Sequence, residues 1–540
     1  MNMYSVKNGK WIKYGLLLGI FALFAVTRLW QLTTLPYGIH IDEAGMAYDA
    51  WCLSEYGVDR YLKSWPVYLT NLGGGQSSLY AFLCAGLFRV FGYNVWLVRL
   101  PAAAFSLLNL VFGMKLVKKV YPQSTFLPLA AGGLLTICPY FILSSRFGLD
   151  CNLMLGMSTL FLYCLVTAVQ SGKIFRYVIA GFAGGLLLYT YALAYMILPL
   201  FLMLAFGYLL RGRRFSLKGW AAMAVPMGIL ALPLILVQAV NYFDLEEFRL
   251  GCFTITKLKR YRVSELEWFG PGKFCKALFS IFAGDFLGEK LEYNSAPGYL
   301  NLYGITVLLC LTGIVNTLRK LWKSLKKRET DMAVMIFLWF AAILFFESHI
   351  PTNVNRINGI FFTAVFLAVE GAYTLIFGLI SGRGKRWMLT GIIGIYIVCF
   401  VRFSAYYYSG KYTAETYLLP YFDIPVTEAL TFIEQDETLR DKETQMSEME
   451  IYYALSTLIS PYELRFGTRE ESCYRKYHFG GLGGIEDGCN YIVRDGFDEY
   501  CELLRAAGFT EQRYEGYSLF YKKSLSDSHS SARGCSGWAK

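Results

Sequence analysis

The sequence has few charged residues for its length. Charged side chains make up 17% of the 540 residues and hydrophobic ones 55%, whereas an ordinary soluble domain carries about 25% charge. This composition argues against a soluble enzyme and favours lipid as the solvent for much of the chain. Lysine and arginine outnumber aspartate and glutamate by 51 to 40. The basic residues lie between apolar runs, which is typical of cytoplasmic loops rather than of a nucleic-acid-binding surface.

Histidines and paired cysteines are also scarce. The four histidines show no metal-ligand spacing, and the 13 cysteines are scattered without a CxxC pair, many of them inside apolar stretches. These patterns favour neither a zinc site nor a disulfide framework. The glycine runs do not fit the spacing of a nucleotide-binding loop, so a nucleotide-sugar domain is not expected.

Long apolar windows dominate what the sequence does contain. A bilayer core about 30 Å thick needs around 20 apolar residues per helix, and eleven such windows predict a polytopic α-helical membrane protein with about eleven transmembrane helices. The run Leu79–Phe91 is too short to cross, and we interpret it as an interfacial helix. The windows begin near Tyr14, Val95, Thr125, Cys151, Phe175, Ala192, Lys218, Tyr299, Asp331, Ile357 and Arg386.

The charge of the connecting loops predicts one orientation. If the N-terminus is cytoplasmic, every short inside loop is basic, as the positive-inside rule requires, and eleven spans place the C-terminus outside the plasma membrane. The first span could instead be a signal peptide, but no small-x-small cleavage site follows it, which favours retention. The basic clusters lie at residues 7–13, 115–119, 173–176, 211–218, 320–328 and 383–386.

We therefore expect a transmembrane domain over residues 1–404, with outer loops at about 31–94 and 241–298, and an extracytoplasmic α/β domain over 405–523. Residues 524–540 are rich in serine and glycine, which predicts a disordered tail. Periodicity within the α/β domain indicates an amphipathic stretch at Val426–Gln435, strands at Ile451–Leu458 and Tyr491–Val493, a helix near Phe497–Ala507, and alternation over Tyr514–Tyr521.

Two adjacent carboxylates, Asp42 and Glu43, directly follow the first span. Acidic residues at membrane depth tend to mark function, although the pair could simply cap a helix that starts at Ala44. Neighbouring helical residues point about 100° apart. We therefore expect one carboxylate to do chemistry and the other to orient it. Gln76 and Tyr80 follow in the same loop, which is rich in aromatic residues that suit a sugar face, a headgroup or the lipid interface equally well.

Two short outer loops carry further candidates. Arg146 and Asp150 could form an i,i+4 ion pair, or could supply a cation for phosphate and a second carboxylate. Arg356 could be a snorkelling anchor, or could bind phosphate oxygens in a bidentate manner. His349 lies in the same loop, and with His40 and Asp42 it could hold a divalent metal, although the histidine spacing does not favour a metal site.

These motifs resemble the membrane glycosyltransferases of family 39, which have the GT-C fold and include protein O-mannosyltransferases and aminoarabinose transferases. The resemblance covers about the first 400 residues. It departs at Ser77 and Ser78, where relatives often carry prolines. It rests on Gly38–Ala44, Gly75–Tyr80, Arg99–Pro101, Pro139–Asp150 and Asn355–Asn358.

The resemblance implies an inverting transfer of a sugar from a polyprenyl-phosphate carrier to a hydroxyl acceptor on the outer face of the membrane. Asp42 matches the position of a base or acceptor-positioning residue, and Asp150 matches a second acidic position. A base carboxylate, with arginines near the leaving phosphate, fits that chemistry. The acceptor stays open between protein, glycolipid and cell-wall polymer. A transporter or flippase of lipid-linked sugar is the main alternative, and a non-catalytic assembly or sensor protein is a third.

Overall fold

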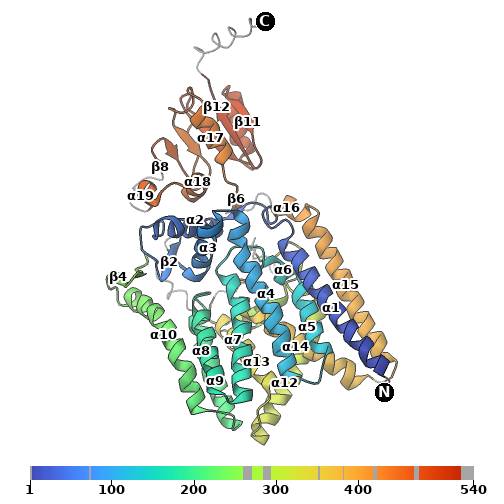
Figure 1. The fold of residues 1–540 in the computed structure, drawn as a ribbon. Coiled ribbons are helices and arrows are strands. Elements are labelled where there is room, and N and C mark those ends of the chain that lie inside the picture. Colours follow the sequence, from blue (N-terminus) through green and yellow to red (C-terminus); the bar gives the residue numbers. More distant parts are fainter. Residues whose placement is uncertain are drawn as a thin grey trace, which may run out of the picture. The chain divides into compact units, whose positions relative to one another are not determined.

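The computed structural model describes residues 3–71, 74–259, 270–283, 294–350, 353–380, 382–416, 422–466 and 473–523, with side chains omitted for 3–10 and 379. The chain forms two compact units (Figure 1). The first, here called the helical unit, comprises Met1–Tyr37 and Ser64–Thr416. The second, here called the α/β unit, comprises Gly38–Lys63 and Tyr417–Lys540. The predicted tail over 524–540 lies outside the described residues.

The helical unit is built from long apolar helices. In the described part of the chain, eight are long and apolar enough to cross a membrane, and four more are apolar but shorter. The long ones are Trp11–Leu29 of α1 (Met3–Leu29), α4 (Val95–Val120), α7 (Cys151–Ser171), α9 (Ala194–Arg211), α10 (Leu217–Tyr242), α12 (Gly304–Lys327), Asn358–Gly378, which combines η3 (Asn358–Ile360), α14 (Phe361–Tyr373) and part of η4 (Thr374–Leu379), and α15 (Gly384–Tyr408). The shorter ones are α3 (Ser78–Phe91), α5 (Phe126–Ile137), α8 (Ile174–Leu188) and α13 (Met332–Glu347).

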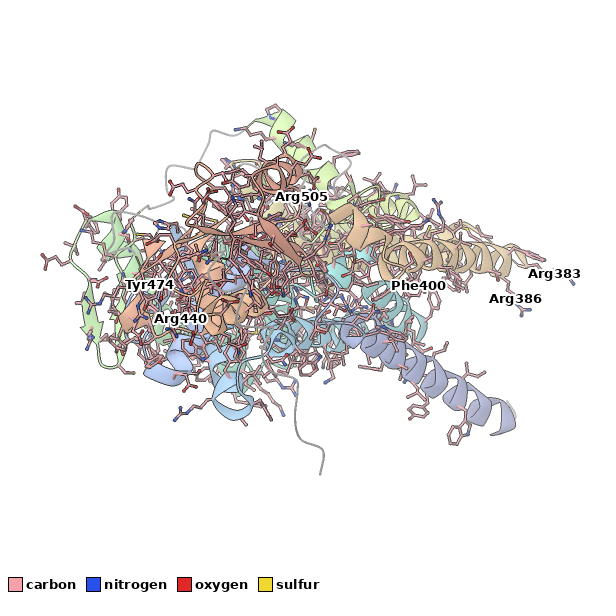
Figure 2. The ribbon with its side chains drawn as sticks, turned by 90° about the horizontal axis from the view of Figure 1, so that it is seen from above. Arg383, Arg386, Phe400, Arg440, Tyr474 and Arg505 are labelled. Atoms are coloured by element: carbon pink, nitrogen blue, oxygen red, sulfur yellow. The ribbon has the colours of Figure 1, made fainter. Side chains whose placement is uncertain are left out.

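Each of the eleven windows found in the sequence contains one of these helices, and the predicted interfacial run forms α3. The count of eleven spans and the interfacial position of α3 stay predictions. Figure 2 shows Arg383 and Arg386 at one end of α15, with Phe400 further along the helix. This end carries one of the basic clusters on which the predicted orientation depends.

Small residues let the helices of this unit approach closely. A Cβ on Gly156 of α7 would lie 2.2 Å from the carbonyl oxygen of Phe105 on α4, so only glycine fits at this crossing. The remaining helices are the short α6 (Pro139–Leu143), α11 (Pro271–Ala283) and α16 (Lys411–Thr416). Two hairpins, β2 (Tyr68–Asn71) with β3 (Gly74–Ser77) and β4 (Phe248–Leu250) with β5 (Phe253–Ile255), complete the unit.

The α/β unit has a six-stranded mixed sheet in the order β11-β12-β10-β7-β9-β8. Strand β7 pairs in parallel with both β10 and β9, and the other pairs are antiparallel. Helix α2 (Ile41–Tyr56), from the start of the chain, lies beside α18 (Glu450–Thr457) (Figure 1). The other elements are β1 (Ile39–His40), β6 (Phe422–Asp423), α17 (Thr427–Gln435), β7 (Thr444–Met446), α19 (Pro461–Leu464), β8 (Cys473–Tyr474), β9 (Tyr477–His478), β10 (Asn490–Arg494), α20 (Asp498–Ala506), β11 (Thr510–Arg513) and β12 (Tyr517–Tyr521).

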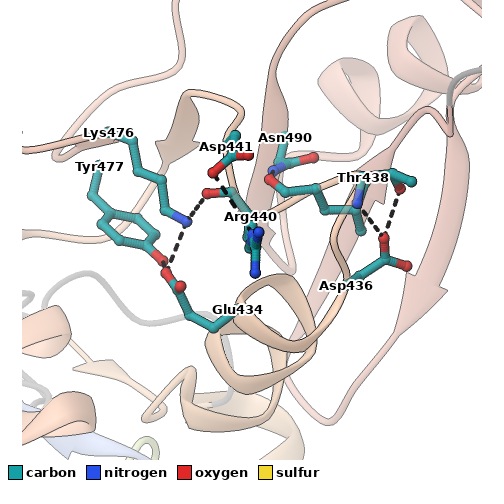
Figure 3. Close-up of polar contacts among 9 residues, drawn as sticks. Glu434, Asp436, Thr438, Arg440, Asp441, Lys476, Tyr477 and Asn490 are labelled. Atoms are coloured by element: carbon teal, nitrogen blue, oxygen red, sulfur yellow. Dashed lines mark hydrogen bonds and ion pairs between the residues drawn. The ribbon is translucent and has the colours of Figure 1, made fainter.

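Polar contacts at the end of α17 join this helix to the sheet (Figure 3). Glu434 accepts a hydrogen bond from the Tyr477 hydroxyl at 2.5 Å and pairs with Lys476 at 2.8 Å. The side chain of Asn490, on β10, donates to the carbonyl oxygen of Leu439 at 3.0 Å. These contacts fix α17 without involving β1 or α2.

Most of the predicted elements of this unit are present, but one is wrong. The predicted strand Ile451–Leu458 is helix α18, in which the five consecutive residues from Ile451 to Leu455 are all buried, so no alternation of buried and exposed residues is present. The structure also groups Gly38–Lys63 with the C-terminal segment, whereas the sequence motifs placed that stretch in the first domain.

Candidate functional site

The acidic motif after the first span begins helix α2. His40 caps this helix, and its Nδ1 accepts a hydrogen bond from the backbone N–H of Asp42 at 3.1 Å. Burial lowers the pKa of His40, although the charge of Asp42 opposes this. A neutral ring that accepts at Nδ1 carries its proton on Nε2. The Asp42 side chain is 35% exposed, with Oδ2 at 3.8 Å from Nδ1 of His40, while Glu43 is buried.

The C-terminal segment holds this motif in place. Strand β1 pairs with β6, with Ile39 opposite Asp423 and His40 opposite Phe422. Gly38 has a φ of 72°, and a Cβ on it would lie 3.0 Å from the carbonyl oxygen of Asp423. Any other residue at position 38 would therefore be strained, because its backbone would need a positive φ and its Cβ would crowd the carbonyl oxygen of Asp423. The loop motif and the C-terminal segment are thus parts of one structure.

Two other acidic residues of this stretch have structural partners. Asp49 accepts a bidentate hydrogen-bonded pair from Arg60, at 3.0 and 2.8 Å. Asp59 accepts hydrogen bonds from the backbone N–H groups of Tyr61 and Lys63. Burial, with the charge of Asp49, raises the pKa of Asp59 to about 7. These bonds close the loop after α2.

Asp150 lies in the helical unit, as the N-cap of α7. Its Oδ1 accepts from the backbone N–H of Cys151 at 2.8 Å, and its Oδ2 accepts from the backbone N–H of Ser77 at 2.9 Å. The second bond joins the carboxylate to the end of the β2–β3 hairpin and the start of α3. Both oxygens are therefore held by backbone donors from different parts of the chain.

An asparagine network connects this region to the Arg356 loop. Asn294 donates to Asn152 at 2.7 Å and to Asn355 at 2.6 Å, and Asn358 donates to Asn152 at 3.3 Å. All four side chains are buried. Asn152 is two residues from Asp150, and Asn355 is next to Arg356. The network therefore brings the Asp150 and Arg356 segments together, as buried hydrogen-bonded amides can do at low cost.

Three further residues belong to the same region of the helical unit. The Tyr191 phenol, in the turn between α8 and α9, interacts electrostatically with Asp150, Arg356 and Glu347. Glu347 ends α13 and is buried, and its carboxylate in turn interacts with Arg356. His349 follows two residues later, with Nδ1 at 2.9 Å from the carbonyl oxygen of Phe345.

Arg146 is buried and binds backbone carbonyls at the end of α1. It donates to the carbonyl oxygens of Leu35, Thr27 and Trp30 at 2.6–3.1 Å. Its guanidinium also lies 5.7 Å from the ring centroids of Tyr407 and Tyr408. A cation here offsets the partial negative charge of unpaired carbonyls at a helix C-terminus. Four of its five N–H donors are engaged by these bonds.

The two remaining candidates differ in their surroundings. The Tyr80 hydroxyl donates to the carbonyl oxygen of Val98 at 2.9 Å and accepts from the N–H of Ala102 at 3.2 Å. The hydroxyl thus connects the carbonyl of Val98 to the N–H of Ala102 within α4, next to Pro101, which lacks an N–H. Gln76 is 5% exposed, and its Oε1 has no hydrogen-bond partner among the described residues. Among those residues, no three His, Cys, Asp or Glu side chains gather to hold a metal ion.

Sequence reasoning missed the asparagine network, the carbonyl partners of Arg146 and the strand partner of the acidic motif. Asn355 and Asn358 stood in a quoted motif, but Asn294 carried no signal. Asp150 and Arg356 were separate candidates in the sequence, and the asparagine network brings their segments together. Asp42 and Glu43 lie in the other unit.

Comparison with known proteins extends this picture. A family model described as dolichyl-phosphate-mannose-protein mannosyltransferase matches residues 76–240. The structure of ArnT from Cupriavidus metallidurans bound to undecaprenyl phosphate is similar with a TM-score of 0.54 at 14% identity, covering 94% of this chain and 98% of that one. Its apo state gives 0.53 at the same identity and coverage.

AglB from Archaeoglobus fulgidus, in complex with an inhibitory peptide and a dolichol-phosphate, is 11% identical and covers 84% of this chain and 64% of its own, with a TM-score of 0.49. No curated protein sequence matches the chain. The chain is an integral membrane protein with the fold of ArnT, and the predicted resemblance to membrane glycosyltransferases of the GT-C fold is confirmed.

Proposed function

We propose that the protein is an inverting glycosyltransferase that moves a sugar from a polyprenyl-phosphate carrier to a hydroxyl acceptor outside the cell membrane. The observation that carries this proposal is the Asp150–asparagine–Arg356 region, in a chain that aligns over 94% of its length with ArnT bound to undecaprenyl phosphate. The family model matched by residues 76–240 describes a transferase that uses a lipid-phosphate sugar.

Asp42 is the proposed general base. Its half-exposed carboxylate would accept the proton of the acceptor hydroxyl as that oxygen attacks the anomeric carbon. In the same step the bond from that carbon to the phosphate oxygen breaks, with its electron pair moving to the phosphate, so a single displacement inverts the centre. His40 holds the backbone of Asp42, and buried Glu43 would orient the start of α2.

Arg356 is the proposed phosphate ligand. A leaving phosphate needs no general acid but gains negative charge, which a guanidinium stabilises. Asp150 would keep the Ser77 backbone in place beside Gln76, whose buried Oε1 is available to a sugar hydroxyl. His349 lies two residues from Glu347 and could donate to the phosphate. The bonds of Arg146 to carbonyls support a positioning role for that residue.

The proposed topology places the N-terminus in the cytoplasm and the C-terminus outside. It is supported by the basic residues of every short inside loop. Residues 1–404 are the proposed transmembrane domain and 405–523 the proposed outer domain, with the first loop supplying Asp42. We propose no nucleic-acid partner.

The test uses the full-length protein in liposomes with radiolabelled mannosyl-, glucosyl- and aminoarabinosyl-undecaprenyl phosphate, and with cell-wall and membrane fractions as acceptors. We expect one donor to lose its label to an acceptor. Asp42→Asn should lower turnover by ~10²–10⁴-fold, the usual contribution of a general base. Asp441→Asn, at a carboxylate that is 85% exposed in the same unit, is the matched control.

Two results would contradict the proposal. Label that crosses the bilayer on the intact lipid, equally in wild type and Asp42→Asn, would indicate a flippase. Transfer that survives in Asp42→Asn at the level of Asp441→Asn would remove Asp42 from the chemistry.

A further inference from the structure

A buried ion pair involves β6, the strand that pairs with β1 just before Asp42. Asp423 pairs through its backbone with Ile39, and its Oδ1 is 3.0 Å from Nε of Arg494. Arg494 ends β10, and its backbone N–H donates to the Ser447 hydroxyl at 2.9 Å. The pair therefore connects the two-stranded β1–β6 ladder to the six-stranded sheet. The Asp423 side chain is 9% exposed and that of Arg494 18%.

Two tyrosines attach the same stretch to the segment around α18. The Tyr452 hydroxyl donates to the carbonyl oxygen of Ile39 at 3.1 Å, and the Tyr48 hydroxyl donates to the carbonyl oxygen of Ile459 at 2.6 Å. Tyr452 also interacts electrostatically with Asp423, Arg494, Glu43 and Asp42. The start of α2 is thus held from β6, from α18 and from the turn after α18.

A second buried carboxyl belongs to this cluster. Glu448 is 2% exposed, and its Oε2 has no hydrogen-bond partner among the described residues. Both Asp423 and Arg494 act on it electrostatically. One arginine thus acts on two carboxyl groups, and its ion pair with Asp423 joins β6 to the end of β10. Removing the arginine leaves the buried Asp423 carboxyl without its ion-pair partner, which is costly.

We propose that Asp423 and Arg494 are positioning residues of the transfer reaction, which set the place of Asp42 by fixing β1 and the first turn of α2 to the C-terminal sheet. This inference rests on the proposed function. If the inference holds, the C-terminal part of the α/β unit contributes to catalysis by positioning Asp42.

The test compares Arg494→Ala, Arg494→Lys and Asp423→Asn with the matched control Lys476→Ala. Lys476 pairs with Glu434 in the same unit (Figure 3), and its side chain is 17% exposed, but neither residue belongs to β1 or β6. We expect Arg494→Ala to lower kcat by ~10–100-fold, because small displacements of a catalytic group cost that much. The KM for the polyprenyl-phosphate donor should change less than about 2-fold, since Arg356 lies in the helical unit.

Arg494→Lys should recover part of the lost kcat because it keeps the charge, while Lys476→Ala should keep wild-type kcat. Hydrogen exchange gives a readout independent of activity. The amides of residues 39–45 should exchange faster in Arg494→Ala and Asp423→Asn, and at the wild-type rate in Lys476→Ala.

Wild-type kcat in Arg494→Ala, or an equal loss of kcat in Arg494→Ala and Lys476→Ala, would overturn the inference. If no donor supports turnover by the wild-type protein, the proposed function fails, and exchange decides the inference alone. Equal exchange of residues 39–45 in the two alanine variants would then refute it, and selective acceleration in Arg494→Ala would support the anchoring on which it depends.

Discussion

At the scale of the residue, two arginines of the helical unit have different surroundings and different proposed roles. Arg356 is half-buried near Glu347 and Asp150, whereas Arg146 is buried among carbonyl oxygens. We predict that Arg356→Ala lowers kcat by ~10²–10³-fold, the loss expected for one charge-stabilising donor. Arg356→Lys should recover only part of this, because an ammonium cannot make a bidentate contact with phosphate. Steady-state kinetics with the labelled donor measure both. A full recovery by lysine would argue against bidentate binding.

Replacing Arg146 by methionine should instead destabilise the fold. Each buried carbonyl that loses its donor costs about 1–3 kcal/mol, so a total of about 3 kcal/mol or more is expected. The melting temperature in detergent should fall, while the donor KM of the folded protein stays unchanged. Arg386→Met, at the exposed end of α15 (Figure 2), is the control. A raised KM at an unchanged melting temperature would place Arg146 at the phosphate.

Single residues could be proposed from sequence where a side chain itself carries the chemistry. Asp42, Asp150 and Arg356 stood out as charges next to apolar runs. Asn294 did not, because its partner Asn152 lies 142 positions away and an isolated asparagine in a loop has no periodicity. The partners of Arg146 were equally hidden, since a backbone carbonyl leaves no mark in the sequence.

At the scale of the element, the β2–β3 hairpin positions Ser77 for Asp150. A Cβ on Gly75 would lie 2.0 Å from Cε1 of Tyr68, which pairs with Ser77, so Gly75→Ala must displace the Tyr68 ring or the strand that carries it. We predict ~10-fold lower kcat, because the Ser77 N–H would no longer meet the Asp150 carboxylate. Gly86→Ala on α3, where nothing lies within 4 Å of an added Cβ, should keep activity and gain slight stability. Equal kcat in the two variants would show that the hairpin is not coupled to turnover.

Helices and strands were predictable from the sequence where lipid alone determines the hydrophobic pattern. Apolar windows located the helices of the helical unit because lipid requires long uninterrupted runs. In the α/β unit, α18 was mistaken for a strand because Ile451, Tyr452 and Tyr453 have high strand propensity, and burial against α2 decided the conformation. The pairing of β1 with β6 joins residues almost 400 positions apart, and two-residue strands are too short to show alternation.

At the scale of the whole molecule, orientation in the membrane is testable through native thiols. Cys252 and Cys275 are exposed and lie in the second predicted outer loop. We predict that a membrane-impermeant maleimide labels them on intact cells. In a variant lacking Cys252, Cys275 and Cys535, a cysteine introduced by Lys327→Cys in a predicted inside loop should label only after permeabilisation. The opposite pattern would reverse the topology and place Asp42 in the cytoplasm.

The stability of the α/β unit should depend on pH through its buried carboxyls. Burial, followed by the charge of Asp423, raises the pKa of Glu448 from 4.5 to about 8. Burial raises the pKa of Asp423 from 3.8 to about 6, although Arg494 opposes this. A raised carboxyl pKa means that the folded state holds the proton more tightly than the unfolded state. The stabilisation is therefore complete below about pH 4 and is lost as the pH rises to about 8.

We predict that Glu448→Gln leaves the unit as stable as wild type at pH 4 but makes it more stable at pH 8.5, because an amide never ionises. Hydrogen exchange at Ile492 and Val493 on β10 measures this, with variant and wild-type rates compared at each pH so that the intrinsic exchange rate cancels. The ratio should approach one at pH 4, and wild type should exchange at least about 10-fold faster at pH 8.5, since each pKa unit is worth about 1.4 kcal/mol. Glu463→Gln, at a side chain that is 57% exposed, should give a ratio of one at both pH values. If Glu448→Gln gives that flat ratio too, Glu448 is ionised in the folded unit, and Arg494 must neutralise two carboxylates at once.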